Sequence, residues 1–504
     1  MTHLNVLFVT SEMAGLAKAG GLGDVSAGLP RALMRCGVGV RVLMPAYREV
    51  LAKLPAIHWF AHLPGRAGIP PARLGQARTA DGVTLYLADS PALFDRRGTP
   101  YCAPDGSDWP DNDLRFARLS LAAADIAAGR AGLDWTPDLV HANDWPGGLT
   151  PAYMRWDGIG VPTVLTVHNI AYQGNFAAAK RSLLGIPDTA FDIHGVEFHG
   201  LVSFLKAGSF YASHVTAVSP TYAAEITTEA LGAGLHGLMA TRTEQGRLSG
   251  IVNGIDDSWN PGTDPYLPYH FDPDDLRGKQ ANAALVRNAL CLRPSRGPLF
   301  GIVSRMVHQK GLDLVAEAAN DIVGNGGQIA ILGLGDPAIE QMLSRTSRQH
   351  RDDIGVLIGF NETMGRRVVA ASDFTLMPSR YEPCGLTQMQ AQRYGALPIA
   401  HATGGLADTI GDGTTGFLFK TLTAAGLMAA CRRAFDTFED AARLAEMRRS
   451  AMGRGFGWPD AAAEYEALYR RLASTRPAEP RIAATAEARR PQSAARIDVF
   501  KPAA

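Results

Sequence analysis

The sequence predicts two Rossmann-like α/β domains, each with a doubly wound parallel sheet, facing each other across a central cleft. Short apolar runs alternate with helical patterns from residue 4 onward, as they do in βαβ units. A Pro- and Asp-rich stretch at residues 256–275 interrupts the alternation, which restarts at residue 299. Polar and glycine-rich motifs follow several of the predicted strands. Ligands of such sheets bind outside the carboxyl ends of the strands, so we expect the chemistry in the cleft.

The first domain is predicted from short runs rich in apolar and β-branched residues. The run at residues 4–10 precedes a glycine-rich loop and a helical pattern from about residue 24 to 36. Further strands are predicted at residues 38–44, 84–88, 139–141, 163–167 and 214–218. Fully apolar runs of this kind are typical of strands that helices cover on both faces.

The second domain is predicted from the series that begins at residue 299. Its strands are expected at residues 299–304, 328–332, 356–358, 374–377 and 397–400. We therefore place the two domains at residues 1–255 and 256–456. Residues 474–504 are rich in Ala, Arg, Pro and Ser and contain few large apolar residues, a composition that predicts disorder.

The composition gives no support to several classes of partner and site. Of the 504 residues, 46% are apolar, and 49 Lys and Arg balance 49 Asp and Glu. This neutrality gives no reason to expect nucleic acid or an anionic membrane as a partner. The five cysteines are scattered and form no C-x-x-C pair, so neither a disulfide framework nor a zinc site is predicted. No signal-type or membrane-spanning segment is recognisable, and we expect a cytoplasmic protein.

A glycine-rich loop, Lys18 to Asp24 (KAGGLGD), separates the first predicted strand from the first helix. Its glycines allow a ligand to approach the backbone, the helix N-terminus offers N–H groups, and Lys18 adds a positive charge. These features favour a phosphate, although a tight turn with a surface lysine is the alternative. The motif is neither a Walker A loop nor G-x-G-x-x-G.

Two cations open the second domain. Arg305 ends its first strand and Lys310 precedes the next helix. Together they could hold the two phosphates of a nucleoside diphosphate and stabilise it as a leaving group. The alternative is a solvated, charged loop, which is the usual place of Arg and Lys; Lys18 shifts the balance toward a phosphate site.

Two more loops follow later strands of the second domain. In Arg380 to Leu386 (RYEPCGL), Glu382 precedes a predicted helix start at which Pro383 suits the first turn. Glu382 is thus either a contact to a sugar or the transition state, or a helix cap. In Thr403 to Asp408 (TGGLAD), backbone N–H groups could hold the same diphosphate.

Polar clusters also end two strands of the first domain. One is His141 to Trp145 (HANDW), and the other contains His168 and Asn169. His, Asn and Asp side chains can hydrogen-bond sugar hydroxyls, and Trp145 or Tyr172 could pack against a sugar face. A histidine at a strand end is often structural, but two such clusters together favour a binding site.

These motifs, in this order, resemble those of bacterial glycogen synthases and plant starch synthases. The resemblance runs from about residue 4 to 473 and includes the K-x-G-G-L-x-D signature. It also rests on HANDW, His168-Asn169, Ile193-His194-Gly195, Ala217 to Pro220, Asn253-Gly254, Ser304-Arg305 through Leu312, Glu382 to Leu386, and Thr403 to Asp408.

The resemblance implies the GT-B fold, with a final helix at about residues 457–473 crossing back to the first domain. It implies a retaining glycosyltransferase that moves glucose from ADP-glucose to the non-reducing end of an α-1,4-glucan, in glycogen biosynthesis. Neither a metal nor another cofactor would be needed.

The resemblance also assigns site residues. It implies catalytic roles for Glu382, His168, Arg305, Lys310 and Asp144. Donor-binding residues would be Lys18, Gly20, Gly21, Asp24, Asn253, Arg305, Lys310, Cys384, Gly385, Leu386, Thr403, Gly404, Gly405 and Leu406. Tyr101 and Asn169 would contact the sugar or the acceptor.

Two positions depart from relatives: Gln390 replaces a second glutamate, and Phe360 replaces a tyrosine found in some members.

Retention by double displacement would need a carboxylate nucleophile, and no motif supplies one, so we expect front-face attack. Rival interpretations are a UDP-glucose-dependent relative, an NAD-dependent oxidoreductase and an inactive glucan-binding protein. The K-x-G-G-L motif counts against the UDP-glucose-dependent relative. The missing G-x-G-x-x-G counts against the oxidoreductase. The retained charged residues count against the inactive glucan-binding protein.

Overall fold

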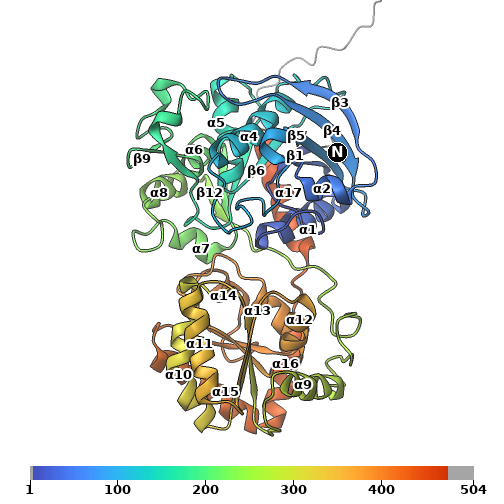
Figure 1. The fold of residues 1–504 in the computed structure, drawn as a ribbon, viewed down its shortest axis with the longest axis vertical. Coiled ribbons are helices and arrows are strands. Elements are labelled where there is room, and N and C mark those ends of the chain that lie inside the picture. Colours follow the sequence, from blue (N-terminus) through green and yellow to red (C-terminus); the bar gives the residue numbers. More distant parts are fainter. Residues whose placement is uncertain (1–3, 475–504) are drawn as a thin grey trace, which may run out of the picture.

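The computed structural model describes residues 4–474 as two α/β halves joined at a narrow waist (Figure 1). The upper half contains a nine-stranded sheet in the order β12-β11-β7-β6-β1-β2-β5-β4-β3, and the lower half a six-stranded sheet in the order β15-β14-β13-β16-β17-β18. All strand pairs of the lower sheet are parallel, as are those from β12 to β5 in the upper one. The predicted fold class is confirmed.

The elements from β1 to β12 form most of the upper half. Its main sheet consists of β1 (Asn5–Val9), β2 (Gly39–Pro45), β3 (His58–Leu63), β4 (Ala72–Arg78), β5 (Thr84–Asp89), β6 (Leu139–Asn143), β7 (Thr163–Val167), β11 (His214–Ala217) and β12 (Leu248–Gly250). Its helices are α1 (Gly21–Arg35), α2 (Arg48–Lys53), α3 (Pro91–Phe94), α4 (Asn112–Ala127), α5 (Leu149–Trp156), α6 (Phe204–Tyr211), α7 (Pro220–Glu225) and α8 (His236–Glu244). A small separate sheet contains β8 (Asn175–Ala177), β9 (Glu197–Phe198) and β10 (Leu201–Ser203).

The lower half begins with a helix and then alternates strand and helix. Its strands are β13 (Leu299–Val303), β14 (Gln328–Gly333), β15 (Ile354–Ile358), β16 (Phe374–Met377), β17 (Leu397–His401) and β18 (Phe417–Phe419). Its helices are α9 (Arg277–Ala289), α10 (Leu312–Gly324), α11 (Pro337–Gln349), α12 (Glu362–Ala371), α13 (Thr387–Arg393), α14 (Gly404–Thr409), α15 (Ala424–Glu439) and α16 (Ala441–Met452).

Every strand predicted from an apolar run is present, but several strands were not predicted. The antiparallel pair β3 and β4 extends one edge of the upper sheet. These strands lack the continuous apolar pattern on which the prediction relied, because β3 is mostly exposed or half-buried. The short strands β12 and β18 and the small sheet were missed for lack of length. Helix α1 starts at Gly21, three residues before the expected start.

The last helix, α17 (Trp458–Ser474), leaves the lower half and packs beside α1 in the upper half (Figure 1). Gly28 of α1 makes room for it, because a Cβ there would lie 2.0 Å from the indole nitrogen of Trp458. The two chain crossings lie side by side at the waist, where Ile255 N–H donates to the carbonyl of Phe456 at 2.7 Å.

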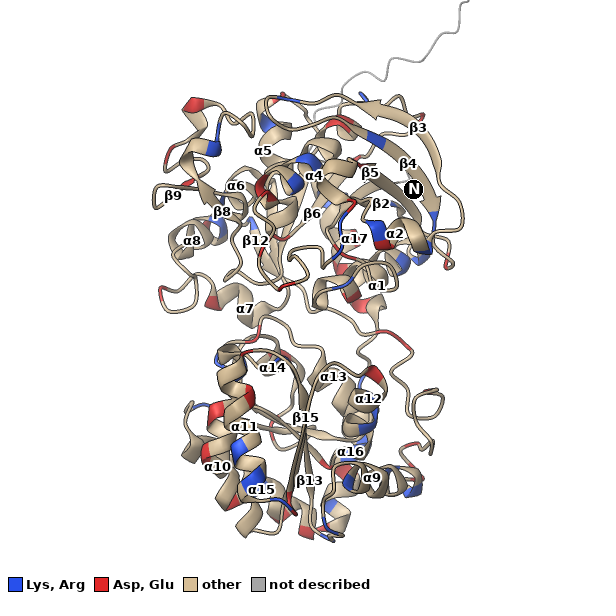
Figure 2. Ribbon diagram, in the orientation of Figure 1, with Lys and Arg blue, Asp and Glu red and all other residues tan. Residues whose placement is uncertain are grey.

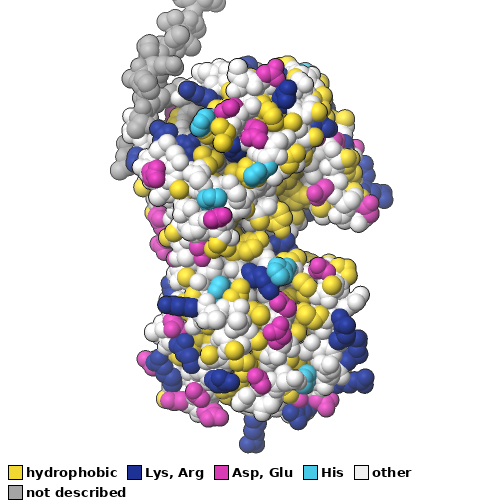
Figure 3. All heavy atoms as spheres, turned by 90° about the vertical axis from the view of Figure 1, so that its left-hand side faces the viewer, with side chains coloured by type: hydrophobic (Ala, Val, Ile, Leu, Met, Phe, Trp, Pro, Cys, Tyr) yellow, Lys and Arg dark blue, Asp and Glu magenta, His cyan; other side chains and the backbone are white. Residues whose placement is uncertain are grey.

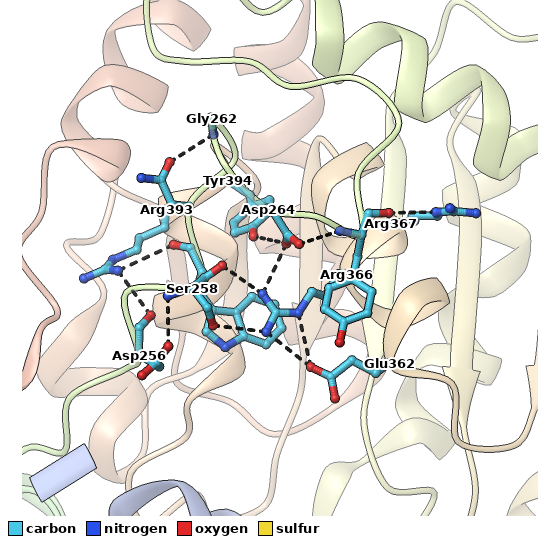
Figure 4. Close-up of polar contacts among 12 residues, drawn as sticks. Asp256, Ser258, Gly262, Asp264, Glu362, Arg366, Arg367, Arg393 and Tyr394 are labelled. Atoms are coloured by element: carbon cyan, nitrogen blue, oxygen red, sulfur yellow. Dashed lines mark hydrogen bonds and ion pairs between the residues drawn. The ribbon is translucent and has the colours of Figure 1, made fainter. Parts of the chain in front are cut away.

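Beyond the first crossing, the segment that contains Ser258 and Asp264 is attached to the lower half (Figure 4). Arg366 of α12 donates to the carbonyl of Ser258 at 2.9 Å and to Asp264 at 3.2 Å. Its guanidinium also lies 4.0 Å from the ring centroid of Trp259. The main chain therefore passes between the halves at two short crossings near residues 255 and 456.

The domain limits at 255 and 456 remain predictions, as does the assignment of α17 as a separate segment. The expected disordered tail lies outside the described residues, except for Ser474 at the end of α17. Within residues 4–474, no helix is long and apolar enough to cross a membrane.

Candidate active site

The loops that follow the carboxyl ends of both sheets face each other at the waist. Figure 3 shows the surface hollowed between the two halves, with hydrophobic side chains above the hollow and Lys, Arg and His side chains along its lower rim. Elsewhere, Lys and Arg are interspersed with Asp and Glu over both halves (Figure 2). The predicted site residues come from loops on both sides of this hollow.

Lys310 and Glu382 form an ion pair in the lower half. Lys310 Nζ lies 2.5 Å from Glu382 Oε2, and the Ser379 hydroxyl donates to the same oxygen at 3.0 Å. The Glu382 side chain is 7% exposed and that of Lys310 18%. A buried carboxylate with two donors is held in one orientation, so the loops that follow β13 and β16 together fix a charged pair beyond the carboxyl ends of these strands.

The structure rules out a capping role for Glu382. Helix α13 begins only at Thr387, so neither Glu382 nor Pro383 belongs to its first turn, and the expected helix start was wrong. Residues 380–386 instead form a loop, and Gly385 adopts a φ of 69° within it.

Arg305 lies on the exposed rim of the lower half. Its Nη1 donates to the hydroxyl of Tyr172 of the upper half at 3.5 Å. Nearby, the side chain of Asn169 hydrogen-bonds to Tyr381. The loops after β7 and β13 therefore meet across the cleft, beside the Glu382 loop.

The glycine loop at residues 18–24 is shaped by Glu12, which belongs to the segment Ser11-Glu12-Met13 that precedes the K-x-G-G-L-x-D signature but was assigned no role from the sequence. Glu12 Oε2 accepts hydrogen bonds from the N–H groups of Ala19 at 2.6 Å and Gly20 at 2.8 Å. Its Oε1 accepts from the Tyr101 hydroxyl at 2.6 Å. An acid shortly after β1, beyond Thr10 and Ser11, was the only further signal. Tyr101 thus supports the loop, and burial beside Glu12 raises the pKa of its hydroxyl well above the ordinary value.

Lys18 and Asp24 pair at 2.7 Å, and both side chains are more than one-third exposed. They line a cavity of about 790 Å³ between the two halves, together with Leu386 of the lower half. A Cβ on Gly21 would lie 3.9 Å from Leu386 Cδ1. The loop at residues 18–24 therefore faces the Glu382 loop across the cavity.

His168 follows β7. It is held by Asn143, the last residue of β6, and by Asp144, the next residue in the chain. Asn143 Oδ1 lies 3.0 Å from His168 Nε2, and Asp144 Oδ1 accepts the backbone N–H of His168 at 3.3 Å. Burial lowers the pKa of His168 to about 3, so the ring is neutral at physiological pH.

Asp144 is the most unusual residue of the site. Its φ of 52° and ψ of −171° lie in a region that is essentially restricted to glycine. Burial raises the pKa of its carboxyl to about 8, against the hydrogen bonds from the backbone of His168 and Asn169, which lower it. Asp144 therefore carries a proton near neutral pH.

His141 and Asn143 do not reach the cleft, contrary to the expectation that they could contact sugar hydroxyls. Both side chains are fully buried. His141 Nδ1 lies 2.6 Å from the Tyr469 hydroxyl of α17, and its Nε2 lies 2.6 Å from the Thr166 hydroxyl. Desolvation lowers the pKa of His141 to about 3, which marks it as a neutral core histidine.

The backbone donors of the Thr403–Leu406 loop already have partners. The N–H groups of Gly404, Gly405 and Leu406 donate to Glu225 at 2.9 Å, to the Glu382 carbonyl at 3.0 Å and to the Thr403 carbonyl at 3.1 Å. The loop lies so close to the Glu382 loop that a Cβ on Gly404 would approach the Glu382 carbonyl to 1.9 Å. A phosphate at Gly404 would have to replace Glu225, which belongs to α7 of the upper half.

Asn253 and Cys384 contact each other between the halves. Both are buried, and burial raises the pKa of the Cys384 thiol to about 12. The Cys384 thiol is therefore protonated at neutral pH, which does not suit a nucleophile; its role in lining the donor site stays a prediction.

The two departures have distinct surroundings. The side chain of Phe360, after β15, is 86% exposed, and Gln390 of α13 lines the cavity. In the described part of the chain, no group of three or more His, Cys, Asp or Glu side chains is arranged to hold a metal ion.

Two family models match the chain: a starch synthase catalytic domain over residues 5–241 and glycosyl transferases group 1 over residues 292–450. A glycogen synthase from Pseudomonas fluorescens Pf-5 is 55% identical over 93% of this chain and 89% of its own length. Glycogen synthase 1 from Bradyrhizobium diazoefficiens is 51% identical over 92% of this chain and 100% of its own. The chain belongs to the glycogen synthase family. It is a glycosyltransferase, as the resemblance implied.

The solved structures agree with this membership. The catalytic domain of starch synthase IV from Arabidopsis thaliana, bound to ADP and acarbose, superimposes with a TM-score of 0.83 at 32% identity. The match covers 94% of this chain and all of that one. A sucrose-phosphate synthase from Thermosynechococcus elongatus, 18% identical with a TM-score of 0.60, shares the fold. The expected GT-B architecture is therefore confirmed.

Proposed function

We propose that this enzyme transfers glucose from ADP-glucose to the non-reducing end of an α-1,4-glucan, with retention of the α configuration, in the cytoplasm. The observation that carries the proposal is the Lys310–Glu382 pair at 2.5 Å, set in a loop whose Pro383 carbonyl accepts a hydrogen bond from Ser219 of the upper half. The relatives are glycogen synthases, and the similar starch synthase binds ADP and acarbose.

The phosphates of the donor would be held by three cations from two halves. Arg305 and Lys310 belong to the lower half, and Lys18 belongs to the glycine loop of the upper half, where it lines the cavity together with Leu386 and Gln390 of the lower half. Positive charge close to the departing diphosphate stabilises it as the glycosidic bond breaks. Tyr101 and Asn169 would border the sugar. The remaining donor residues would surround the nucleotide: Gly20, Gly21, Asp24, Asn253, Cys384, Gly385, Leu386 and the Thr403–Leu406 loop.

We infer that the acceptor hydroxyl attacks from the side on which the diphosphate leaves. Glu382 is paired with Lys310, and Asp144 holds a proton near neutral pH because burial raises its pKa to about 8. Neither is therefore an obvious nucleophile, and the leaving phosphate would take the acceptor proton. Mass spectrometry of the intact protein checks this, since a trapped covalent glucosyl-enzyme would contradict front-face attack.

The donor is tested by incubating the enzyme with glycogen and labelled ADP-glucose or, separately, labelled UDP-glucose, with and without a chelator. We expect label in the polymer from ADP-glucose, unaffected by the chelator. Label from UDP-glucose alone would indicate a different donor, and label in small products only would indicate a different acceptor.

Glu382 is tested by Glu382→Gln, which keeps the shape of the side chain and removes its charge. If its contact strengthens in the transition state, kcat should fall by about a hundredfold or more while KM for ADP-glucose changes little. Arg277→Gln, which removes an exposed charge on α9, is the matched control and should leave both constants unchanged. An equally active Glu382→Gln enzyme would reduce Glu382 to a structural partner of Lys310.

A further inference from the structure

Asn143 lies behind His168 and its amide orientation is determined by its surroundings. The side chain is fully buried at the end of β6. Its Nδ2 donates to the carbonyl of Val9 in β1 at 3.0 Å, and its Oδ1 lies 3.0 Å from His168 Nε2. Because a backbone carbonyl can only accept, the amide NH₂ must face Val9 and the amide oxygen must face His168.

An oxygen that can only accept determines which ring nitrogen of His168 carries the proton. Nε2 must be an N–H to hydrogen-bond to Oδ1, and a neutral imidazole then has its lone pair on Nδ1. Within residues 4–474, Nδ1 has no hydrogen-bond partner and is not a buried atom. It is thus left for solvent or a ligand at the carboxyl end of β7.

We propose that Asn143 is a positioning residue that holds His168 as the Nε2–H tautomer and so presents the Nδ1 lone pair to a hydroxyl of the transferred glucose. This inference rests on the proposed function, which places His168 beside that sugar. Asp144 binds the backbone N–H of the same histidine. Two consecutive residues of β6 and its following turn therefore fix the ring and the main chain of His168.

The tautomer is measured directly by long-range ¹H–¹⁵N correlation spectra of the enzyme labelled in its histidine rings. The enzyme has 13 histidines, and the spectrum of His168→Gln identifies the signals of His168. We expect the wild-type ring to be the neutral Nε2–H tautomer. A wild-type Nδ1–H tautomer would overturn the proposal, whatever the variants do.

Asn143→Leu removes the acceptor at nearly constant volume. The Nε2–H group would then be buried without a partner, which is costly, so the Nδ1–H tautomer should gain population. We expect kcat to fall about tenfold or more with a smaller change in KM for ADP-glucose. Asn143→Asp retains an oxygen toward Nε2 and, at alkaline pH, should keep the wild-type tautomer and recover part of kcat.

The matched control is Asn282→Leu. Asn282 of α9 is another buried asparagine, and its amide donates to the Tyr269 carbonyl at 2.6 Å, in the lower half. Its loss should leave the His168 signals and kcat unchanged. A tautomer that persists in Asn143→Leu would refute the positioning role.

The two proposals fail in different ways. If Asn143→Leu changes the tautomer while kcat stays constant, the tautomer is unimportant for the reaction and the inference is wrong. If His168→Gln is also fully active, the failure lies instead in the proposed role of His168 at the sugar. A changed tautomer together with a lowered kcat supports the inference.

Discussion

At the scale of single residues, Asp144 combines backbone strain with a perturbed proton affinity. Its φ of 52° with a ψ of −171° costs on the order of 1–3 kcal/mol for a residue with a Cβ. Its carboxyl also holds a proton in the folded protein up to about pH 8, whereas the ordinary pKa is 3.8. Strain of this kind persists only where the surrounding structure imposes it, and here it aims the carboxyl at the backbone of His168.

We expect Asp144→Gly to be more stable and less active than the wild type. Glycine relieves the backbone strain at this position. The gain in free energy of unfolding of Asp144→Gly over the wild type should grow with pH. A raised folded pKa means that the wild type is fully stabilised by this group below about pH 4 and loses that contribution as the pH rises through 8. Unfolding in urea across this pH range, with kcat measured alongside, checks both effects.

The control for Asp144→Gly is Cys291→Gly. Cys291 has a φ of 57° and is exposed after α9, in the lower half. It should gain stability without losing activity. A gain in the stability of Asp144→Gly that does not depend on pH would contradict a protonated carboxyl in the wild type. An undiminished kcat would contradict a role of Asp144 at the site.

At the scale of elements, polar side chains attach α17 to the central strands of the upper sheet. The Tyr469 hydroxyl lies 2.6 Å from His141 Nδ1 in β6. His141 in turn contacts Thr166 in β7, whose hydroxyl lies 2.6 Å from that of Thr216 in β11. The C-terminal helix is therefore part of the core of the half that begins the chain, and His141 serves this attachment.

We expect Tyr469→Phe to lower the free energy of unfolding by about 1 kcal/mol or more, because it leaves a buried ring nitrogen without a partner. Activity at temperatures below the transition should be unchanged, since His141 does not reach the cleft. Tyr269→Phe, at a tyrosine that is 48% exposed, should affect neither property. A selective loss of kcat in Tyr469→Phe would indicate that His141 contributes to the active site.

At the scale of the whole molecule, the two halves are joined by two adjacent crossings and by small polar contacts. Thr221 of α7 donates its hydroxyl to Asp408 at 2.6 Å, and Glu225 accepts the Thr403 hydroxyl at 2.8 Å. Interfaces of this kind permit relative motion of domains. A ligand that contacts both halves should therefore shift the molecule toward its closed form.

Small-angle scattering with and without ADP tests this expectation. We expect the radius of gyration to decrease on addition of ADP, because phosphate contacts from Lys18 and Lys310 draw the halves together. Lys310→Gln should weaken this response, while Arg277→Gln should retain it. Identical scattering curves of the wild type with and without ADP would contradict closure.

The sequence alone predicted the fold class, every central strand and the candidate cations Lys18, Arg305 and Lys310. These features are local: a buried strand needs an apolar run, and a loop after a parallel strand faces the ligand edge of the sheet. Membership of the glycogen synthase family followed from motifs in a fixed order, which is also a property of the sequence.

The tertiary structure alone decided which polar side chains reach the cleft. His141 and Asn143 belong to the same motif as Asp144, yet they are buried by α17 and β1. Glu12 and Glu225 contact loops seven or more residues away, Glu225 across the waist. Such partners are distant in sequence and depend on how the elements pack, so no local pattern could identify them.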